Sequence, residues 1–171
     1  MKVLLVALLL LAVVVVAAGA YMGAFARIEI TEEDRGPFTF VYRDMASGEM
    51  NKIGEITTSL NALLESRGVA LREPLDVFLP DGRGEIGFAV EDAAPEQLTA
   101  LTAHSGLKEI PRQRCMVAQF PWRNATSFLV GYFKVDPALS KYRDAHGYKR
   151  VEALALNDGN VIVYMQPIVR E

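Results

Sequence analysis

The order of the predicted elements is the feature that most constrains the fold of this chain, because it occurs twice. Aromatic and β-branched runs that read as strands alternate with segments whose apolar residues recur at helical spacing. The predicted elements lie at residues 38–42, 51–67, 75–79 and 85–90 in the first half, and at residues 115–120, 125–146, 151–156 and 160–165 in the second. Two such units commonly join into one antiparallel sheet with the helices on one face. We therefore expect an α+β fold made of duplicated β-α-β-β modules.

Turn residues separate these elements where the repeat requires them. Pro80–Gly84 and Asn157–Gly159 are typical of hairpin turns between paired strands. Asn124 is expected to cap the N-terminus of the second helical segment. Asp136 and Pro137 read as a second N-cap followed by proline, so we expect that helix to break there and to restart.

An uncharged run of 24 residues, residues 3–26, precedes the repeat. A helix of that length spans roughly 36 Å, against about 30 Å for the hydrocarbon core of a bilayer. Its first part contains only leucine, valine and alanine, with no amphipathic period that could face a protein core. We therefore expect a single-pass membrane protein with an N-terminal anchor, for which the bilayer is a partner. The small residues at 18–20 leave a cleaved signal peptide as the alternative, and the basic residues do not decide the side of the membrane.

This interpretation divides the chain into three parts. The expected parts are an N-terminal transmembrane anchor at residues 1–26, a polar juxtamembrane linker at residues 27–37 and a folded domain at residues 38–171. A domain of this size can bury enough apolar surface to fold independently of the bilayer.

Charge and composition exclude several classes of function. The chain has 18 Lys and Arg against 21 Asp and Glu, without the basic excess of a nucleic-acid-binding protein, so we expect no nucleic-acid partner. Cys115 is the only cysteine, which excludes an internal disulfide and a zinc site built from several thiolates. The two histidines have no matching ligand cluster, and there is no glycine-rich phosphate loop, so we expect neither a metal nor a cofactor.

Glu152 is the candidate functional carboxylate. Alternation along the predicted strand places it on the same face as Leu154 and Leu156. A carboxylate in an apolar row lies either at a wet rim of the sheet or buried beside a partner. If it is buried, its pKa rises, and a cationic ligand restores the charged form. Scattered aromatic residues could wall a ligand pocket or pack in the core: Tyr42, Phe120, Trp122 and Tyr132.

Four segments in the second half resemble the GyrI-like small-molecule-binding domain, which also occurs as the effector-binding domain of MerR-type and AraC-type regulators. The matching segments are Cys115–Trp122, Asp136–Tyr142, Arg150–Glu152 and Tyr164–Ile168. The resemblance implies a cleft between two half-modules that takes amphipathic, often cationic small molecules between aromatic walls. It also implies that Glu152, in the penultimate strand, is the buried glutamate of that cleft.

A second resemblance includes the N-terminal run. The chain is similar to the single-pass testis-expressed ER-phagy receptor family around Gly19–Gly23, Tyr42, Phe120–Pro121 and Asp136–Leu139. It ends at Glu171, where that family continues into a long disordered tail, so a receptor role is not implied.

Three functions stay open at this point. The first is a membrane-anchored domain that binds a small amphipathic ligand, with Glu152 as the counter-charge. The second is a hydrolase of reactive small molecules in which Glu152 is the general acid or base. The third is a membrane-proximal protein adaptor with a vestigial cleft and an unknown protein partner.

Overall fold

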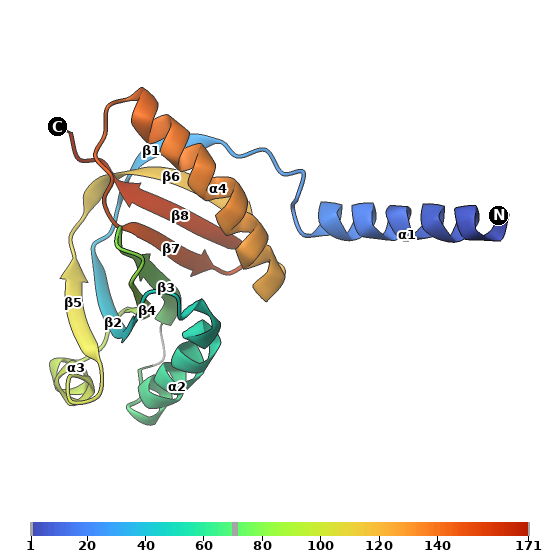
Figure 1. Cartoon of the computed structure of the whole chain (residues 1–171). Coiled ribbons are helices and arrows are strands. Elements are labelled where there is room, and N and C mark those ends of the chain that lie inside the picture. The colour runs from blue at the N-terminus through green and yellow to red at the C-terminus, as the bar shows by residue number, and fades with distance from the viewer. Residues whose placement is uncertain (1, 70–71, 171) are drawn as a thin grey trace.

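The structure is a computed structural model that describes residues 2–69 and 72–170 (Figure 1). Its helices are α1 (Lys2–Tyr21), a 3-10 turn η1 (Met50–Lys52), α2 (Ile53–Ser66), α3 (Pro95–Leu101) and α4 (Ala125–Ala145). Its strands are β1 (Ile30–Arg35), β2 (Phe38–Met45), β3 (Arg72–Phe78), β4 (Gly84–Val90), β5 (Gly106–Ile110), β6 (Gln113–Pro121), β7 (Ala153–Asp158) and β8 (Val161–Pro167). The α+β class expected from the sequence is confirmed.

All eight strands belong to one antiparallel sheet, in the order β1-β6-β8-β7-β3-β4-β2-β5. The first half contributes β2, α2, β3 and β4, and the second contributes β6, α4, β7 and β8. In each half the third strand lies between the first two, so the repeated element order is also a repeated strand order. The halves join where β3 pairs with β7, from Leu75 opposite Leu156 to Phe78 opposite Ala153.

The helices that follow β1 cover one face of the sheet, which we call the helix face. Because successive side chains of a strand point to opposite faces, each strand contributes to two separate cores. On the helix face, Leu60 and Leu64 of α2 pack on Val41 of β2, while Val135 and Leu139 of α4 pack on β6 and β8. The opposite face forms its own cluster, which includes both Ile110 of β5 and Cys115 of β6 although these strands lie toward opposite edges of the sheet.

Helix α4 approaches the sheet closely at Gly131. A Cβ atom at this position would lie 2.6 Å from the hydroxyl oxygen of Tyr164 and 2.9 Å from Cδ1 of Phe120. The absence of a side chain therefore sets the distance between α4 and the sheet. Asn124 caps the helix as expected, accepting a hydrogen bond of 3.1 Å from the backbone N–H of Ser127.

The predicted helix break at Pro137 is wrong, because α4 continues from Ala125 to Ala145 with Pro137 inside it. Proline lacks an N–H and therefore leaves the carbonyl group four residues earlier, on Phe133, without its helical partner. Phe133 is 72% exposed. Water can hydrate the freed carbonyl on this side of the helix, so the chain tolerates the proline without ending the helix.

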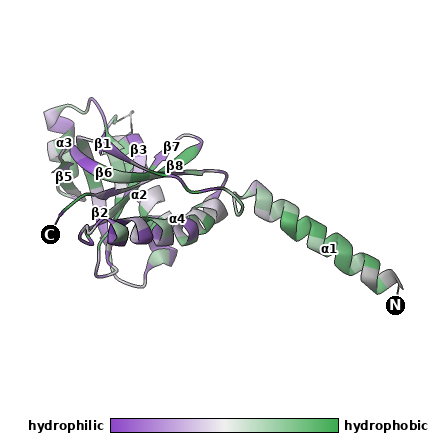
Figure 2. Ribbon diagram, turned by 90° about the horizontal axis from the view of Figure 1, so that it is seen from above, coloured by the Kyte–Doolittle hydropathy of each residue, from purple (hydrophilic) through white to green (hydrophobic). Residues whose placement is uncertain are grey.

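The predicted single-pass membrane protein is also wrong. In the described part of the chain, no helix is long and apolar enough to span a bilayer. Helix α1 is largely hydrophobic and projects away from the domain (Figure 2), but it ends at Tyr21. The last residues of the expected 3–26 span form turns against the domain, where a Cβ at Gly23 would lie 2.8 Å from the Phe120 ring. Lys134 of α4 donates hydrogen bonds to the carbonyl groups of Ala24 and Ala26, at 2.7 and 2.6 Å.

The segment expected as a juxtamembrane linker contains β1. This strand pairs with β6, from Ile30 opposite Ala118 to Arg35 opposite Gln113. Part of residues 27–37 therefore extends the sheet at its edge.

We predict that two glycine-to-alanine substitutions in helices change the free energy of unfolding in opposite directions. Gly131→Ala should destabilise the protein by about 1–3 kcal/mol, because the methyl group overpacks the contact with Phe120 and Tyr164. Gly54→Ala should stabilise it by about 0.5–1 kcal/mol, because a Cβ at Gly54 meets no atom within 4 Å and alanine favours the helix. Urea unfolding of the full chain measures the change in the free energy of unfolding for each variant. Equal changes in the two variants would contradict the close packing at Gly131 and the open space at Gly54.

Candidate functional site

The helix face carries a cavity of about 490 Å³ between α2 and α4, above the junction of the two halves. We call it the inter-helix cavity. Its lining residues come from η1, α2, the start of α4, the residue that follows β6, and five positions on β3, β7 and β8. They are Met50, Ile53, Gly54, Thr57, Thr58, Pro74, Asp76, Trp122, Phe128, Ala155, Asn157 and Ile162.

Asp76 provides the carboxylate at the floor of the inter-helix cavity. In the sheet it lies between Ile86 of β4 and Ala155 of β7. Burial raises the pKa of this carboxyl from 3.8 to about 7, although the backbone N–H of Gly87 hydrogen-bonds to it and lowers the pKa in part. Gly87 cannot carry a side chain, since a Cβ would lie 2.0 Å from the carbonyl oxygen of Val41.

Asn157 supplies a second acceptor beside Asp76. The two residues lie on adjacent strands, with Asn157 two positions beyond the direct partner of Asp76, and both line the inter-helix cavity. The side-chain oxygen of Asn157 is buried and has no hydrogen-bond partner in the described part of the chain. An unpaired buried acceptor costs free energy unless a donor or a positive charge reaches it. The polar part of the floor is therefore suited to a cation or a hydrogen-bond donor.

The walls of the inter-helix cavity are mainly apolar. Trp122 and Phe128 form the side next to α4, and Tyr164 fixes that side because its hydroxyl donates to the carbonyl group of Phe128 at 3.2 Å. On the α2 side, the hydroxyl groups of Thr57 and Thr58 donate to backbone carbonyl groups within the helix. The pKa of Tyr164 is raised by burial and by the nearby charge of Asp76.

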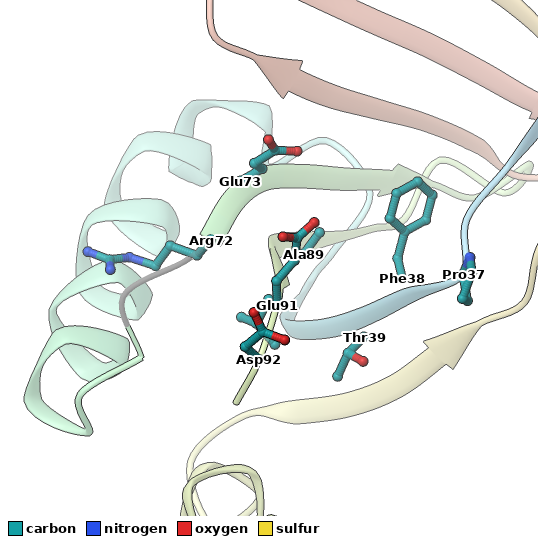
Figure 3. Close-up of a pocket in the computed structure, with 9 residues that line it drawn as sticks. Pro37, Phe38, Thr39, Arg72, Glu73, Ala89, Glu91 and Asp92 are labelled. Carbon is teal, nitrogen blue, oxygen red and sulfur yellow. The ribbon is translucent and has the colours of Figure 1, made fainter. Parts of the chain in front are cut away.

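Two further cavities lie elsewhere. The hairpin cavity, of about 400 Å³, lies between the β3–β4 hairpin, α4 and the segment before β7, and it is described below. The strand-end cavity, of about 500 Å³, lies at the ends of β2, β3 and β4 (Figure 3). Glu73, Glu91 and Asp92 line it, whereas the side chain of Arg72 turns toward α2, where Nη2 donates to Glu65 at 2.6 Å. The pKa of Glu73 is raised by burial, by Asp158 and by Glu91, so this cavity is acidic and polar.

The sequence-predicted aromatic residues lie in different places. Of this group, Trp122 lines the inter-helix cavity and Tyr132 the hairpin cavity. Phe120 is fully buried in the core beneath α4. Tyr42 lies on the opposite face of the sheet, where its ring stacks on Phe40 at 5.2 Å.

Glu152 precedes β7, is half-buried, and lines none of the three cavities described above. Its charge acts on Cys115, whose pKa is raised to about 11 mainly by burial, with Asp34 and Glu152 adding to it. Cys115 belongs to the core on the face opposite the helices. The assignment of Glu152 as the ligand carboxylate stays a prediction, while the geometry places a different carboxylate, Asp76, in the inter-helix cavity.

Sequence reasoning missed Asp76 for a specific reason. In the run Leu75, Asp76, Val77 it alternates with buried apolar residues, which is also the pattern of a residue facing water. Whether Asp76 faces water or is buried depends on the helices that cover its face of the sheet, and strand alternation does not show them. The residues described by the structure contain no group of three or more His, Cys, Asp or Glu side chains able to hold a metal ion.

Comparison with known proteins reveals similarity in structure alone. No protein-family model matches the chain, and no curated protein matches its sequence. SAV2435, solved with tetraphenylphosphonium bound, has a TM-score of 0.59 at 14% identity, over 82% of this chain and 94% of that one. A hydrolase from Listeria innocua has a TM-score of 0.56 at 11% identity, over 82% of this chain and 92% of that one.

An integron cassette protein from the mobile metagenome of Vibrio cholerae has a TM-score of 0.56 at 11% identity, over 82% of this chain and 95% of that one. At these identities the likeness establishes the fold, which agrees at a coarse level with the GyrI-like resemblance. The nearer resemblance to the ER-phagy receptor family is not shown.

We predict that Asp76→Asn stabilises the protein at neutral and alkaline pH. Because folding raises the pKa of this carboxyl from 3.8 to about 7, the folded state keeps a proton that the unfolded state has lost between these values. The free energy of unfolding therefore falls as pH rises through this range, by about 1.4 kcal/mol per pH unit at most. Above pH 7 the contribution of Asp76 no longer changes with pH.

Asp76→Asn removes this dependence. Urea unfolding of both proteins from pH 4 to pH 8 should show an advantage for the variant that grows with pH to about 2–4 kcal/mol. Parallel stability curves over this range would mean that Asp76 is already ionised in the folded protein at low pH.

Proposed function

We propose that this protein is a GyrI-like binding domain that takes a small amphipathic cation into the inter-helix cavity, with Asp76 as its counter-charge. The observation that carries the proposal is the position of this carboxylate. It lies at the floor of a largely apolar cavity, where burial disfavours its charged form. A cation bound above it would restore the charge, and the apolar body of the ligand would meet Trp122 and Phe128.

The division of binding energy follows from this geometry. Burial of the ligand's apolar surface contributes roughly 25 cal/mol per Å² and supplies most of the affinity. The carboxylate of Asp76 selects positively charged groups, and the side-chain oxygen of Asn157, which has no partner within residues 2–69 and 72–170, selects hydrogen-bond donors. SAV2435 binds tetraphenylphosphonium, a cation of this class, and its fold is similar to that of this chain.

We predict that tetraphenylphosphonium binds the full chain with an affinity that depends on Asp76 and on pH. Below about pH 7 the ligand must displace a proton from Asp76, so affinity should fall by about tenfold per pH unit. Asp76→Asn should bind at least about tenfold more weakly at pH 8 and should show no such pH dependence. Isothermal titration calorimetry measures both quantities.

Two carboxylates outside the cavity are matched controls. Glu73→Gln removes a carboxylate from the strand-end cavity, and Glu152→Gln tests the residue that the family resemblance selects. The proposal expects both variants to bind as the unmodified chain does. Loss of binding in Glu152→Gln with retention in Asp76→Asn would move the site to the opposite face and refute the assignment of Asp76.

We also predict that a large side chain at Gly54 blocks the ligand without unfolding the protein. Gly54 lines the inter-helix cavity, and a Cβ there meets nothing within 4 Å. Gly54→Leu should therefore fill the cavity, keep or raise the midpoint of thermal unfolding, and reduce tetraphenylphosphonium affinity by tenfold or more. Gly147→Leu is the control, since a Cβ at Gly147 also meets nothing within 4 Å and Gly147 lines none of the three cavities, although its positive φ costs some stability. Equal affinity in Gly54→Leu would place the ligand elsewhere.

Hydrolysis of a reactive ligand in the same cavity is the second candidate. A carboxyl with a pKa of about 7 is suited to proton transfer at neutral pH, and one structural neighbour is a hydrolase. Turnover of an activated ester that disappears in Asp76→Asn would distinguish this activity from simple binding.

A further inference from the structure

The hairpin cavity adjoins the inter-helix cavity along the helix face. Met50 lines both cavities. A row of three aromatic rings also connects them, since Phe78 lies 6.4 Å from Phe128 of the inter-helix cavity and 6.3 Å from Tyr132 of the hairpin cavity, between ring centroids. The two cavities therefore adjoin at Met50 and along this row of rings, and we call the two together the groove.

The charges of the hairpin cavity differ in sign from those of its neighbour. Three guanidinium groups line it, from Arg83, Arg143 and Arg150, and Asp136 is the carboxylate in its lining. Two of these arginines are paired outside the cavity lining: Arg83 through Nε with Asp81, and Arg143 through Nε and Nη2 with Asp144.

These ion pairs leave part of each guanidinium group available. In the described part of the chain, no hydrogen bond or ion pair involves the Nη atoms of Arg83, the Nη1 atom of Arg143 or the guanidinium group of Arg150. The side chain of Arg143 is only 14% exposed, so its position in the cavity wall is fixed by its surroundings. Side-chain hydroxyl groups of Tyr132 and Ser140 in the same lining can donate to an anion.

We infer that the groove takes a ligand with two charged ends: a cationic apolar group in the inter-helix cavity and a carboxylate in the hairpin cavity, against Arg143 and Arg150. This inference rests on the proposed function and specifies its ligand class. The apolar linker of such a ligand follows the row of aromatic rings from Phe128 to Tyr132. A carboxylate is the group chosen because its planar, two-point hydrogen bonding matches the guanidinium group of Arg150, while Nη1 of Arg143 supplies a further donor.

The test compares matched pairs of phosphonium ions on the full chain. Each pair joins triphenylphosphonium to a butyl or a decyl chain that ends either in a methyl group or in a carboxylate. The carboxylate should tighten binding by about five- to tenfold for at least one chain length. This advantage should disappear in the double variant Arg143→Gln/Arg150→Gln. The methyl-ended and the carboxylate-ended ligands should both still bind more weakly to Asp76→Asn than to the unmodified chain. Arg67→Gln, a substitution of an exposed arginine beyond α2, is the matched control and should keep the advantage.

The outcomes separate the inference from the function on which it rests. If the methyl-ended ions bind and the carboxylate adds nothing at either length, the second subsite is refuted and the cation site stands. If the advantage persists in the double arginine variant, the carboxylate is bound elsewhere and the inference is likewise refuted. If no phosphonium ion binds, the proposed function fails, and the inference fails with it. Because the ligand pairs are compared on the unmodified chain first, the result does not depend on the variants folding.

Discussion

The pairing of β3 with β7 is the interaction on which the rest of the structure depends. Four residue pairs, from Leu75 opposite Leu156 to Phe78 opposite Ala153, join two halves that would otherwise each expose an unpaired strand edge. The same register places Asp76 opposite Ala155, whose small side chain leaves space above the carboxylate. It also sets α2 and α4 on the same face of the sheet (Figure 1), and the inter-helix cavity is lined by residues of both helices.

Holding this cavity open costs stability. The carboxyl of Asp76 is kept where its charged form is disfavoured, and the side-chain oxygen of Asn157 is buried with no hydrogen-bond partner among the residues that the structure describes. Groups of this kind cluster at functional sites, because a ligand can supply the interactions that the protein lacks. The neighbouring arginines of the hairpin cavity extend this principle to the opposite charge, so that one groove presents acceptors at one end and donors at the other.

Several features were predictable from local sequence. The hairpin turns, the cap at Asn124 and the periodicity of α2 depend on residues close together in the chain, and the structure shows each of them. The continuity of α4 through Pro137 was not predictable in this way, because packing of Val135 and Leu139 on the sheet holds the helix on both sides of the proline. The extent of the N-terminal helix also depended on distant groups: the turns after Tyr21 lie against Phe120 and Lys134, which are about a hundred positions away in the chain.

The sequence by itself determined the class of the fold and its internal repeat, because hydrophobic period and turn chemistry are local properties. The resemblance to GyrI-like domains implied a buried carboxylate and aromatic walls, while the residues alone left Glu152 either at a wet rim or buried. Only the tertiary structure decided which carboxylate lies in a cavity. Alternation along a strand distinguishes two faces but not which of them is covered, and the face of Asp76 is covered only because two helices from different halves pack on one continuous sheet.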